Sequence, residues 1–581
     1  MGELKKGRRG WMGRRWRPMP PDPERAGEIA RLLGVPPLVG QLLINRGLFD
    51  PERAHRFLSP ALEHLHPPAL LPNLEIGVER LVEAFRRGEK ILVFGDYDVD
   101  GMTGVSLLVR ILKPLARGGI YYYVPKRLEE GYGLSVEAIE KAARQGVRLI
   151  LTVDSGITAR AEVAYARERG IEVIVTDHHQ PGEELPEAAA VIDPKLPGSR
   201  YPFPDLAGVG VAFKLGWALM ERGLVPREDL LRHLDLVALG TIADVVPLVD
   251  ENRVLARHGL LQLNRTENPG LRALLEVTRL GEREVTAGHV GFILAPRLNA
   301  TGRLGDASPG VRLLLTGDPE RAREIAKVLD RDNQERQRLE TEVLEEAIAR
   351  IEAGVDLSAE RAIVLAAPGW HPGVIGIVAS RLVESFHRPV ILVSLEGEEG
   401  RGSARSIPGF NLYAGLAECA AHLERFGGHE AAAGLTVRRE KMDDFARAFA
   451  AVARASIPPS LLEPSLRIEA EVDLAEADLA LAREVARLAP YGPGNPAPVL
   501  ACREVRVLDC RGVGENNKHL KLRLAQSGTV REGIGFNLGS AAAEVALSRT
   551  VDLAFTLEEN TFNGATEVQL CLRDLICRTA V

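Results

Sequence analysis

The residues best able to do chemistry are three alternating carboxylates, Asp96, Asp98 and Asp100. Carboxylates this close repel one another at neutral pH, so they need a cation or strong solvation. The apolar run 91–94 comes just before them, which places them at the end of a predicted strand. Hard oxygen ligands are those that Mn²⁺ and Mg²⁺ prefer. The cluster therefore predicts a divalent-metal site.

Two further polar groups follow apolar runs of the same kind. Asp154 comes directly after 149–153, and Asp177-His178-His179 come directly after 171–176. Asp154 alone would be interpreted as the cap of the next helix. Carboxylates and imidazoles at three successive strand ends instead indicate a hydrolase that activates water with metal ions.

The elements that must position these residues form an alternating series between about 76 and 250. Amphipathic stretches such as 136–145 and 159–169 separate the apolar runs. This alternation predicts a parallel sheet covered by helices on both faces, with ligands beyond the carboxyl ends of its strands. The predicted strands are 91–94, 119–124, 149–153, 171–176 and 190–192.

The second half of the chain predicts different architecture. Residues 320–353 are highly charged and lack Pro and Gly, whereas Pro319 precedes them and Gly354 ends them, as expected of one long helix. A second α/β unit follows, and after about 465 short alternating runs indicate a small antiparallel β domain or barrel. The predicted parts are a basic arm and helical lead-in (1–75), a catalytic α/β domain (76–316), a connecting helix (317–355), a second α/β domain (356–456) and a β domain (457–581).

Composition narrows the class of protein. The 581 residues are 45% hydrophobic and 26% charged, which is typical of a soluble globular protein. The net charge of -7 argues against a generally basic nucleic-acid coat but allows a local basic groove. The five cysteines form no close pairs, so we expect reduced thiols in a cytoplasmic protein. Neither a membrane span nor a secretory signal is expected.

The first 18 residues form a basic arm with seven Lys or Arg and two interleaved tryptophans, Trp11 and Trp16. One interpretation is a disordered, solvated tail. The other is an arm that contacts phosphate and stacks on bases.

These motifs resemble the DHH phosphoesterase superfamily, whose name describes residues 177–179, and within it the RecJ family of exonucleases. Supporting segments occur in order at 127–134, 296–304, 369–381, 402–409, 427–429 and 491–496. The resemblance implies an OB-fold for the β domain and a single-stranded-DNA-specific 5′→3′ exonuclease that releases mononucleotides in DNA recombination and repair. It also implies a monomer that works with a helicase and a single-strand-binding protein.

The resemblance further implies two bound metal ions, Mn²⁺ or Mg²⁺. Asp98 would bind one ion and Asp100 the other, with Asp154 between them. Asp96 would lie behind the ligands, and His179 would hydrogen-bond a ligand or the scissile phosphate. The coordination would be completed by His178 and Asp244, although Asp244 on local grounds could be an ordinary helix-end carboxylate.

The resemblance also implies residues that hold the 5′ phosphate, for which the planar guanidinium of arginine is suited. Ordinary surface salt bridges are the alternative for each arginine. Arg405 is expected in a Gly/Ser-rich turn, and Asn299 and Arg297 either contact phosphate or support the domain junction. Trp370, beside His371, either packs in the core or stacks on a base. The phosphate candidates are Arg127, Arg303, Ser403, Arg405, His429 and Asn299.

The β domain offers a basic run with aromatic residues that would bind a single strand, as OB-folds do. Solvated strand faces and ordinary core explain the same residues. The candidates are Lys518, His519, Lys521, Arg523, Phe536 and Phe562.

Two competing functions remain. Some superfamily members hydrolyse short oligonucleotides, cyclic dinucleotides or pyrophosphate, but they lack the third domain and the lead-in. Others have lost their ligands and act as scaffolds, whereas here every expected ligand is present. The chain ends soon after the β domain, so we expect no additional C-terminal domain and no partner docking through one.

Overall fold

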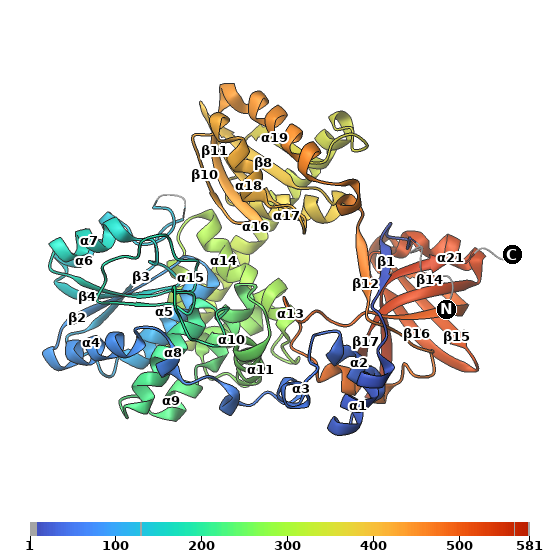
Figure 1. The fold of residues 1–581 in the computed structure, drawn as a ribbon, viewed down its shortest axis with the longest axis horizontal. Helices are drawn as coiled ribbons and strands as arrows, with labels where there is room; N and C mark the ends of the chain where they lie inside the picture. Colours follow the sequence, from blue (N-terminus) through green and yellow to red (C-terminus); the bar gives the residue numbers. More distant parts are fainter. Residues whose placement is uncertain (1–8, 128–129, 563, 579–581) are drawn as a thin grey trace. The chain divides into compact units, whose positions relative to one another are not determined.

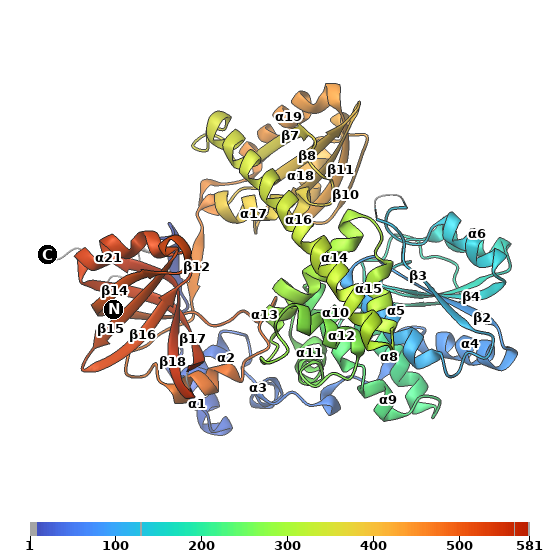
Figure 2. The same ribbon diagram turned by 180° about the vertical axis from the view of Figure 1, so that it is seen from behind.

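The computed structural model describes residues 9–127, 130–562 and 564–578. The chain divides into two compact units. Unit 1 comprises Met1–Leu58, Arg338–Ala489 and Ala497–Val581, and unit 2 comprises Ser59–Gln337 and Pro490–Pro496. Figures 1 and 2 show the elements of each unit from opposite sides.

Unit 2 is built on a five-stranded sheet with the order β3-β2-β4-β5-β6, in which every neighbouring pair is parallel. All five strands lie where the apolar runs predict them, and the parallel sheet is therefore confirmed. Their bounds are β2 (Lys90–Gly95), β3 (Ile120–Tyr123), β4 (Val147–Val153), β5 (Glu172–Thr176) and β6 (Ala190–Ile192).

Both faces of this sheet are buried, which explains why its strands are continuous apolar runs. Ile91 and Val93 of β2 join the hydrophobic core that contains residues of α4 (Leu74–Arg87), α5 (Val99–Leu112) and α8 (Gly208–Glu221). Leu92 and Phe94 point the other way, into the core formed with α6 (Val136–Arg144) and α7 (Arg160–Glu168). The predicted covering of both faces by helices is confirmed (Figure 1).

The remaining helices of unit 2 extend the core beside α8. Of these, α10 (Leu234–Ala243) is apolar nearly all round and is accordingly buried, as expected of a core helix. A π-helical turn, η3 (Val290–Leu294), precedes α14. The others are α9 (Arg227–Leu231), α11 (Asp250–Leu263), α12 (Pro269–Val277), α13 (Ala287–His289), α14 (Ala295–Leu304) and α15 (Ser308–Leu315).

The predicted long helix is α16 (Pro319–Gly354). Ala322, Ala326 and Leu329 near its start belong to the core of unit 2. Val343 and Ala347, nearer its end, belong to a core of unit 1. One continuous helix thus runs from one unit into the other, as the absence of Pro and Gly predicted.

Unit 1 contains a second sheet with the order β10-β11-β9-β8-β7. Only β7 and β8 pair in parallel, and the other pairs are antiparallel. The strands are β7 (Ile363–Pro368), β8 (Val390–Glu396), β9 (Glu399–Arg405), β10 (Arg425–Gly428) and β11 (Ala432–Arg438), and the helices are α17 (Ile375–Phe386), α18 (Leu412–Glu418) and α19 (Met442–Ser456).

The last part of unit 1 is the predicted β-barrel, with the strand order β13-β14-β15-β16-β18-β17 closed by the pair β14–β17. Most of its strand pairs are antiparallel, as predicted, but β13–β14 and β16–β18 pair in parallel. The connection through α21 carries the chain across before β17, which leaves β16 beside β18. The elements are β13 (Ala470–Glu471), α20 (Leu479–Ala486), β14 (Leu500–Val513), β15 (His519–Gln526), β16 (Thr529–Gly535), α21 (Ala542–Ser548), β17 (Thr550–Phe562) and β18 (Ala565–Cys577).

The described part of the basic arm, residues 9–18, is folded, so the interpretation as a disordered tail is wrong for these residues. Residues 15–18 form β1 (Arg15–Pro18), which pairs in parallel with β12 (Ser465–Ile468). Trp16 is buried, and its Nε1–H donates to Asp574 at 3.0 Å, so it packs in the structure and does not stack on bases. Lys5, Lys6 and Arg8 lie outside the described residues.

The predicted helical lead-in is confirmed as α1 (Pro23–Leu33), α2 (Pro37–Ile44) and α3 (Pro51–Leu58). Within the described residues, no single helix has the length and apolarity needed to cross a membrane; the bent pair α1 and α2 meets that test by length and composition alone. All five cysteines are free thiols.

Candidate metal centre

The predicted site residues of unit 2 gather at the carboxyl edge of the parallel sheet. Asp96 follows β2, Asp154 follows β4, and Asp177 follows β5. Since α5 and α7 cover opposite faces, the connections leave β2 and β4 in opposite directions. The site therefore lies at a topological switch point, where sheets of this kind bind ligands.

Helix α5 fixes two of the carboxylates. Asp98 is its N-cap and accepts a hydrogen bond from the Gly101 N–H at 3.1 Å. Asp100, in the first turn, accepts from the N–H groups of Gly208 (2.6 Å) and Val209 (2.8 Å), which begin α8. Only glycine fits at position 101, because a Cβ there would lie 2.5 Å from the Asp96 carbonyl oxygen.

Asp154 has an unusual backbone. Its φ of 59° is uncommon for a residue other than glycine; such a backbone costs about 1–3 kcal/mol and persists only where its surroundings enforce it. Its N–H donates to the Thr176 carbonyl at 3.1 Å, which ties the end of β4 to that of β5. Ala159, not Asp154, precedes the first residue of α7, so the helix-cap interpretation of Asp154 is wrong.

His178 joins the carboxylates into one cluster. Its Nε2 lies 3.0 Å from Asp154 Oδ1, 3.6 Å from Asp244 Oδ2 and 3.8 Å from Asp100 Oδ2. Asp244 is the C-cap of α10, so it is both a helix-end carboxylate and a member of the cluster. Three sets of side chains bring ligand atoms within 4.8 Å of one another: Asp96, Asp98 and Asp154; Asp100, His178 and Asp244; and Asp154, His178 and His179.

The electrostatics show how poorly these carboxylates tolerate one another without a cation. Burial, with the charge of Asp98, raises the pKa of Asp100 to about 7. Burial, with the charge of Asp100, raises the pKa of Asp244 to about 9. The pKa values of Asp96 and Asp154 are raised for the same two reasons, burial first and neighbouring carboxylates second.

The donor set fits divalent metal ions. Asp96 Oδ1 and Asp244 Oδ2 are buried and have no hydrogen-bond partner within the described residues. Burial lowers the pKa of His178 to about 3, so its imidazole is neutral and able to ligate. Several carboxylate oxygens with one imidazole match the preference of Mn²⁺ and Mg²⁺.

The residues that hold His179 were not among the predicted site residues. Asp177 Oδ1 lies 2.8 Å from His179 Nδ1, and the Tyr132 hydroxyl lies 3.1 Å from the same nitrogen. Burial disfavours the charged forms, but the pair's mutual attraction lowers the pKa of Asp177 and raises that of His179. These contacts hold Nδ1 of His179. The position of Asp177 in the 177–179 motif was the signal that could have revealed this role.

The phosphate candidates of unit 2 lie close to this edge. The Arg127 guanidinium lies 5.1 Å from the ring centroid of Tyr97. Burial raises the pKa of Tyr97 to about 12, and the charges of Arg127 and Arg303 act against that rise. Arg303 and Asn299 lie on α14. Arg297 is different, because it donates to Asp330 on α16 at 2.8 Å, which favours the supporting role for it.

The candidates of unit 1 also come together. Arg405 Nη1 donates to Ser403 Oγ at 3.1 Å, and the His429 N–H donates to the carbonyl of Ala432, the residue paired with Arg405. The expected Gly/Ser-rich turn is wrong, since Ser403 and Arg405 lie within β9.

Other candidates have structural explanations. Trp370 is buried, and its Nε1–H donates to Glu346 at 2.8 Å, so core packing is correct for it. In the barrel, Lys521 pairs with Glu532 at 2.9 Å. Phe536 is 60% exposed and stands edge-on to His519, with 5.3 Å between ring centroids, so it is available for stacking. The side chain of Phe562 lies outside the described residues. His371 accepts a hydrogen bond from the Gly373 N–H at 3.0 Å, and strand binding by Lys518 and Arg523 stays a prediction.

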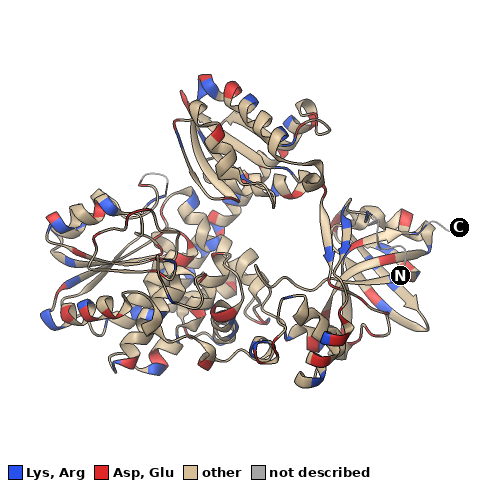
Figure 3. Ribbon diagram, viewed as in Figure 1, with Lys and Arg blue, Asp and Glu red and all other residues tan. Residues whose placement is uncertain are grey.

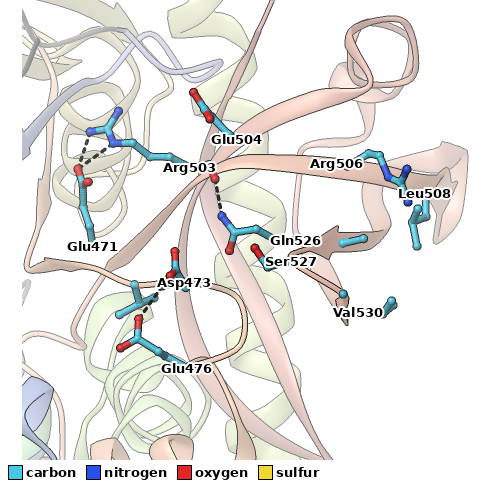
Figure 4. A pocket seen from close by; sticks show the side chains of 13 residues that line it. Glu471, Asp473, Glu476, Arg503, Glu504, Arg506, Leu508, Gln526, Ser527 and Val530 are labelled. Carbon is cyan, nitrogen blue, oxygen red and sulfur yellow. Dashed lines mark hydrogen bonds and ion pairs between the residues drawn. The ribbon is translucent and has the colours of Figure 1, made fainter.

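The barrel also contains a pocket of about 990 Å³ between the segment after β13 and the β15–β16 turn (Figure 4). Its walls carry Glu471, Asp473, Glu476 and Glu504 against two arginines, Arg503 and Arg506. Since Arg503 already pairs with Glu471 at 2.5 Å, the pocket is unsuited to a polyanion. Elsewhere acidic and basic residues are interspersed along the helices of both units (Figure 3).

Three parts of the chain match models of known domain families. The model of the DHH family, N-terminal domain, matches residues 90–241, the DHHA1 domain matches 359–455, and the RecJ OB domain matches 468–574. The single-stranded-DNA-specific exonuclease RecJ of Bacillus subtilis is 38% identical over 96% of this chain and 70% of its own length. The RecJ of Salmonella typhimurium is 38% identical over 95% of this chain and 98% of its own. The chain belongs to the RecJ family.

Solved structures of RecJ agree with this assignment. RecJ from Thermus thermophilus in complex with Mn²⁺ matches with a TM-score of 0.82 and 36% identity, over 98% of this chain and 80% of that one. The same protein in complex with Mg²⁺ matches with a TM-score of 0.77 and 33% identity, over 97% and 79%. The predicted fold class, including the OB-fold of the barrel, is confirmed.

Proposed function

We propose that this chain is a single-stranded-DNA-specific exonuclease that degrades its substrate in the 5′→3′ direction and releases mononucleotides. The observation that carries the proposal is the buried cluster at the edge of the parallel sheet. Asp98, Asp100, Asp154, Asp244 and His178 place oxygen and nitrogen ligand atoms within a few ångströms of one another. Membership of the RecJ family and its Mn²⁺- and Mg²⁺-bound relatives support the choice of reaction and metal.

Two divalent ions would be held, one by Asp98 and the other by Asp100, His178 and Asp244, with Asp154 shared and Asp96 behind it. Such ions polarise the phosphate, lower the pKa of a bound water and stabilise the leaving oxygen. The protein's own contribution is orientation: the N–H groups of Gly208 and Val209 fix Asp100, and Asp177 fixes His179. His179 Nε2 would donate a hydrogen bond to a ligand or to the scissile phosphate.

Each unit supplies its own candidates for recognition of the 5′ end. Arg127, Arg303 and Asn299 belong to unit 2, whereas Ser403, Arg405 and His429 belong to unit 1. A 5′ phosphate carries more negative charge than an internal phosphate, so paired guanidinium groups favour the terminus.

The physiological setting follows from the same proposal. The enzyme would act as a monomer in the cytoplasm, in DNA recombination and repair. A helicase would supply single strands, and a single-strand-binding protein would share the substrate.

The test is degradation of single-stranded DNA labelled at its 3′ end, with Mn²⁺, compared with matched duplex and RNA. Asp100→Asn removes one ligand charge, and Asp235→Asn is the matched control. Asp235 is also buried in a helix of unit 2, but it accepts hydrogen bonds from Leu236 and Thr266 and belongs to none of the metal groups. Stepwise shortening from the 5′ end, lost in Asp100→Asn and kept in Asp235→Asn, is the expected result.

Two outcomes would replace the proposal. Turnover of di- to tetranucleotides without cleavage of long strands would indicate a small-substrate phosphodiesterase. Strand binding without any cleavage would indicate a scaffold.

A further inference from the structure

A short loop far along the chain packs on the backbone that carries the metal ligand Asp244. This loop, residues 490–496, has the sequence Tyr-Gly-Pro-Gly-Asn-Pro from position 491 and lies between α20 and β14. Those two elements belong to unit 1, yet the loop belongs to unit 2. Its Pro493 carbonyl accepts a hydrogen bond from the Leu248 N–H at 2.8 Å, four residues after Asp244.

The contact is too close for residues other than glycine. A Cβ at Gly492 would lie 2.7 Å from Leu248 Cδ1. Gly494 has a φ of +70°, and a Cβ there would lie 3.1 Å from Pro247 Cβ and 3.3 Å from Val249 Cγ1. The two glycines therefore let the 490–496 loop lie directly against residues 247–249.

The loop is rigid in itself. Gly492 and Asn495 exchange two backbone hydrogen bonds of 2.9 and 3.0 Å. Asn495 is fully buried, and its side-chain amide donates to the Pro490 carbonyl at 2.9 Å. A preformed turn of this kind can hold a neighbouring segment in a fixed position.

The segment that it contacts needs such support. Val245, next to Asp244, has a φ of 64°, and Asp250 has a φ of 46°. A β-branched residue at positive φ is a strained outlier, and such strain persists only when the surroundings enforce it. Asn252, on α11, supports the segment from one side through its amide, which donates to the Pro247 carbonyl at 3.1 Å. The 490–496 loop supplies the second support.

We propose that the 490–496 loop is a positioning element for the metal centre: it holds residues 245–249 so that Asp244 stays in line with Asp100 and His178. The inference rests on the proposed metal site but not on the identity of the DNA substrate. A segment that lies between α20 and β14 in the sequence would then contribute directly to metal affinity.

The test is Mn²⁺ binding by the full-length protein without DNA, followed by the electron paramagnetic resonance signal of free Mn²⁺. Gly494→Ala adds a Cβ at positive φ against Pro247 and Val249. The matched control is Gly528→Ala, which also adds a Cβ at positive φ (+84°), in a barrel turn with nothing within 4 Å. We expect the affinity for one bound ion to fall about five- to tenfold in Gly494→Ala, which is the size of effect that release of a strained residue produces. We expect it to be unchanged in Gly528→Ala.

A second variant guards against misfolding. Asn495→Ala removes the amide that closes the loop but leaves the backbone unstrained, and we expect the same selective loss of Mn²⁺ affinity. Thermal unfolding in EDTA separates this from a merely structural role, which would lower stability and leave Mn²⁺ affinity unchanged. If both variants bind Mn²⁺ as the unmodified protein does, the inference is wrong. If the unmodified protein binds Mn²⁺ but degrades no DNA, the proposed function fails while the ion titration still decides the inference.

Discussion

The edge of the parallel sheet and the surface of the β-barrel both carry charged residues that the sequence singles out, but the structure treats them differently. At the sheet edge Asp100 and Asp154 are almost fully buried, and this burial, with neighbouring carboxylates second, raises their pKa values. On the barrel, Lys521 is ion-paired and solvent-accessible. A buried, mutually repelling cluster stays charged only with a bound cation and otherwise takes up protons, whereas a paired surface charge needs neither.

The comparison shows when a charged motif supports a functional interpretation. At the sheet edge, three strands and α10 converge on one point, so the geometry supports a specific role for each side chain. On the barrel, His519, Lys521 and Arg523 alternate along β15 with buried leucines and so lie on its solvent-facing side, where solvation explains them. Substitutions at the sheet edge should therefore affect the protein more than substitutions on the barrel.

The largest effect is expected from removal of a ligand charge at the sheet edge. Asp100→Asn should slow degradation of single-stranded DNA about a thousandfold or more, because loss of an ion removes several kcal/mol of transition-state stabilisation. Rates measured under single-turnover conditions check this. Equal activity of Asp100→Asn and Asp235→Asn would remove the distinction between a ligand and an ordinary buried carboxylate.

Metal removal should destabilise the protein in a pH-dependent way. Folding raises the pKa of Asp100 to about 7 and of Asp244 to about 9, from an ordinary value of 3.8. The metal-free folded state therefore binds more protons than the unfolded state and loses stability as the pH rises through these values. Mn²⁺ replaces the protons, so its gain in Tm should be larger at about pH 9 than at about pH 6.

Differential scanning calorimetry with Mn²⁺ or EDTA measures that gain. Asp244→Asn serves as the comparison, since loss of one titrating carboxyl should reduce the pH dependence. A gain that is independent of pH would show that the carboxylates do not exchange protons for metal.

A smaller, selective effect is expected at the phosphate candidates of unit 1. Arg405→Ala should reduce the preference for a 5′-phosphorylated over a 5′-hydroxyl strand about tenfold, the value of a charged hydrogen bond. Arg401→Ala is the control, because Arg401 lies on the same strand β9 and is exposed. Competition between the two substrates measures the preference, and an equal change in both variants would argue for general electrostatics.

The smallest effect is expected on the barrel. Phe536→Ala should weaken binding of single-stranded DNA about fivefold, since one stacked base contributes about 1–3 kcal/mol at most. Lys521→Ala, which breaks a surface ion pair, should change binding by less than about twofold. Fluorescence anisotropy without Mn²⁺ measures both binding affinities. A larger loss of affinity in Lys521→Ala than in Phe536→Ala would show that the basic run of β15 binds the strand.

The parts of the site that the sequence could predict are those carried by local pattern. Asp98, Asp154 and His178 each follow an apolar strand, and the rule that parallel strands end at one edge brings them together. The long helix α16 could also be predicted, since no Pro or Gly lies between Pro319 and Gly354.

Other features depend on contacts between distant segments, which no local pattern displays. Trp16 looked like a base-stacking residue, but Asp574 accepts its indole N–H more than 500 positions later. The positive φ of Asp154 and Val245 arises from packing and not from residue type. The segment 491–496 supported the family resemblance, but the sequence assigned it no function. The structure places the 490–496 loop beside Leu248.

The most direct test of the central claim is the number of Mn²⁺ ions bound per chain, measured by isothermal titration calorimetry on the unmodified protein and on Asp100→Asn and Asp235→Asn. If the buried cluster is the metal centre, the unmodified protein and Asp235→Asn bind two ions, and Asp100→Asn binds fewer or binds them much more weakly. Equal binding by all three proteins, or degradation of DNA that continues in EDTA, would contradict it.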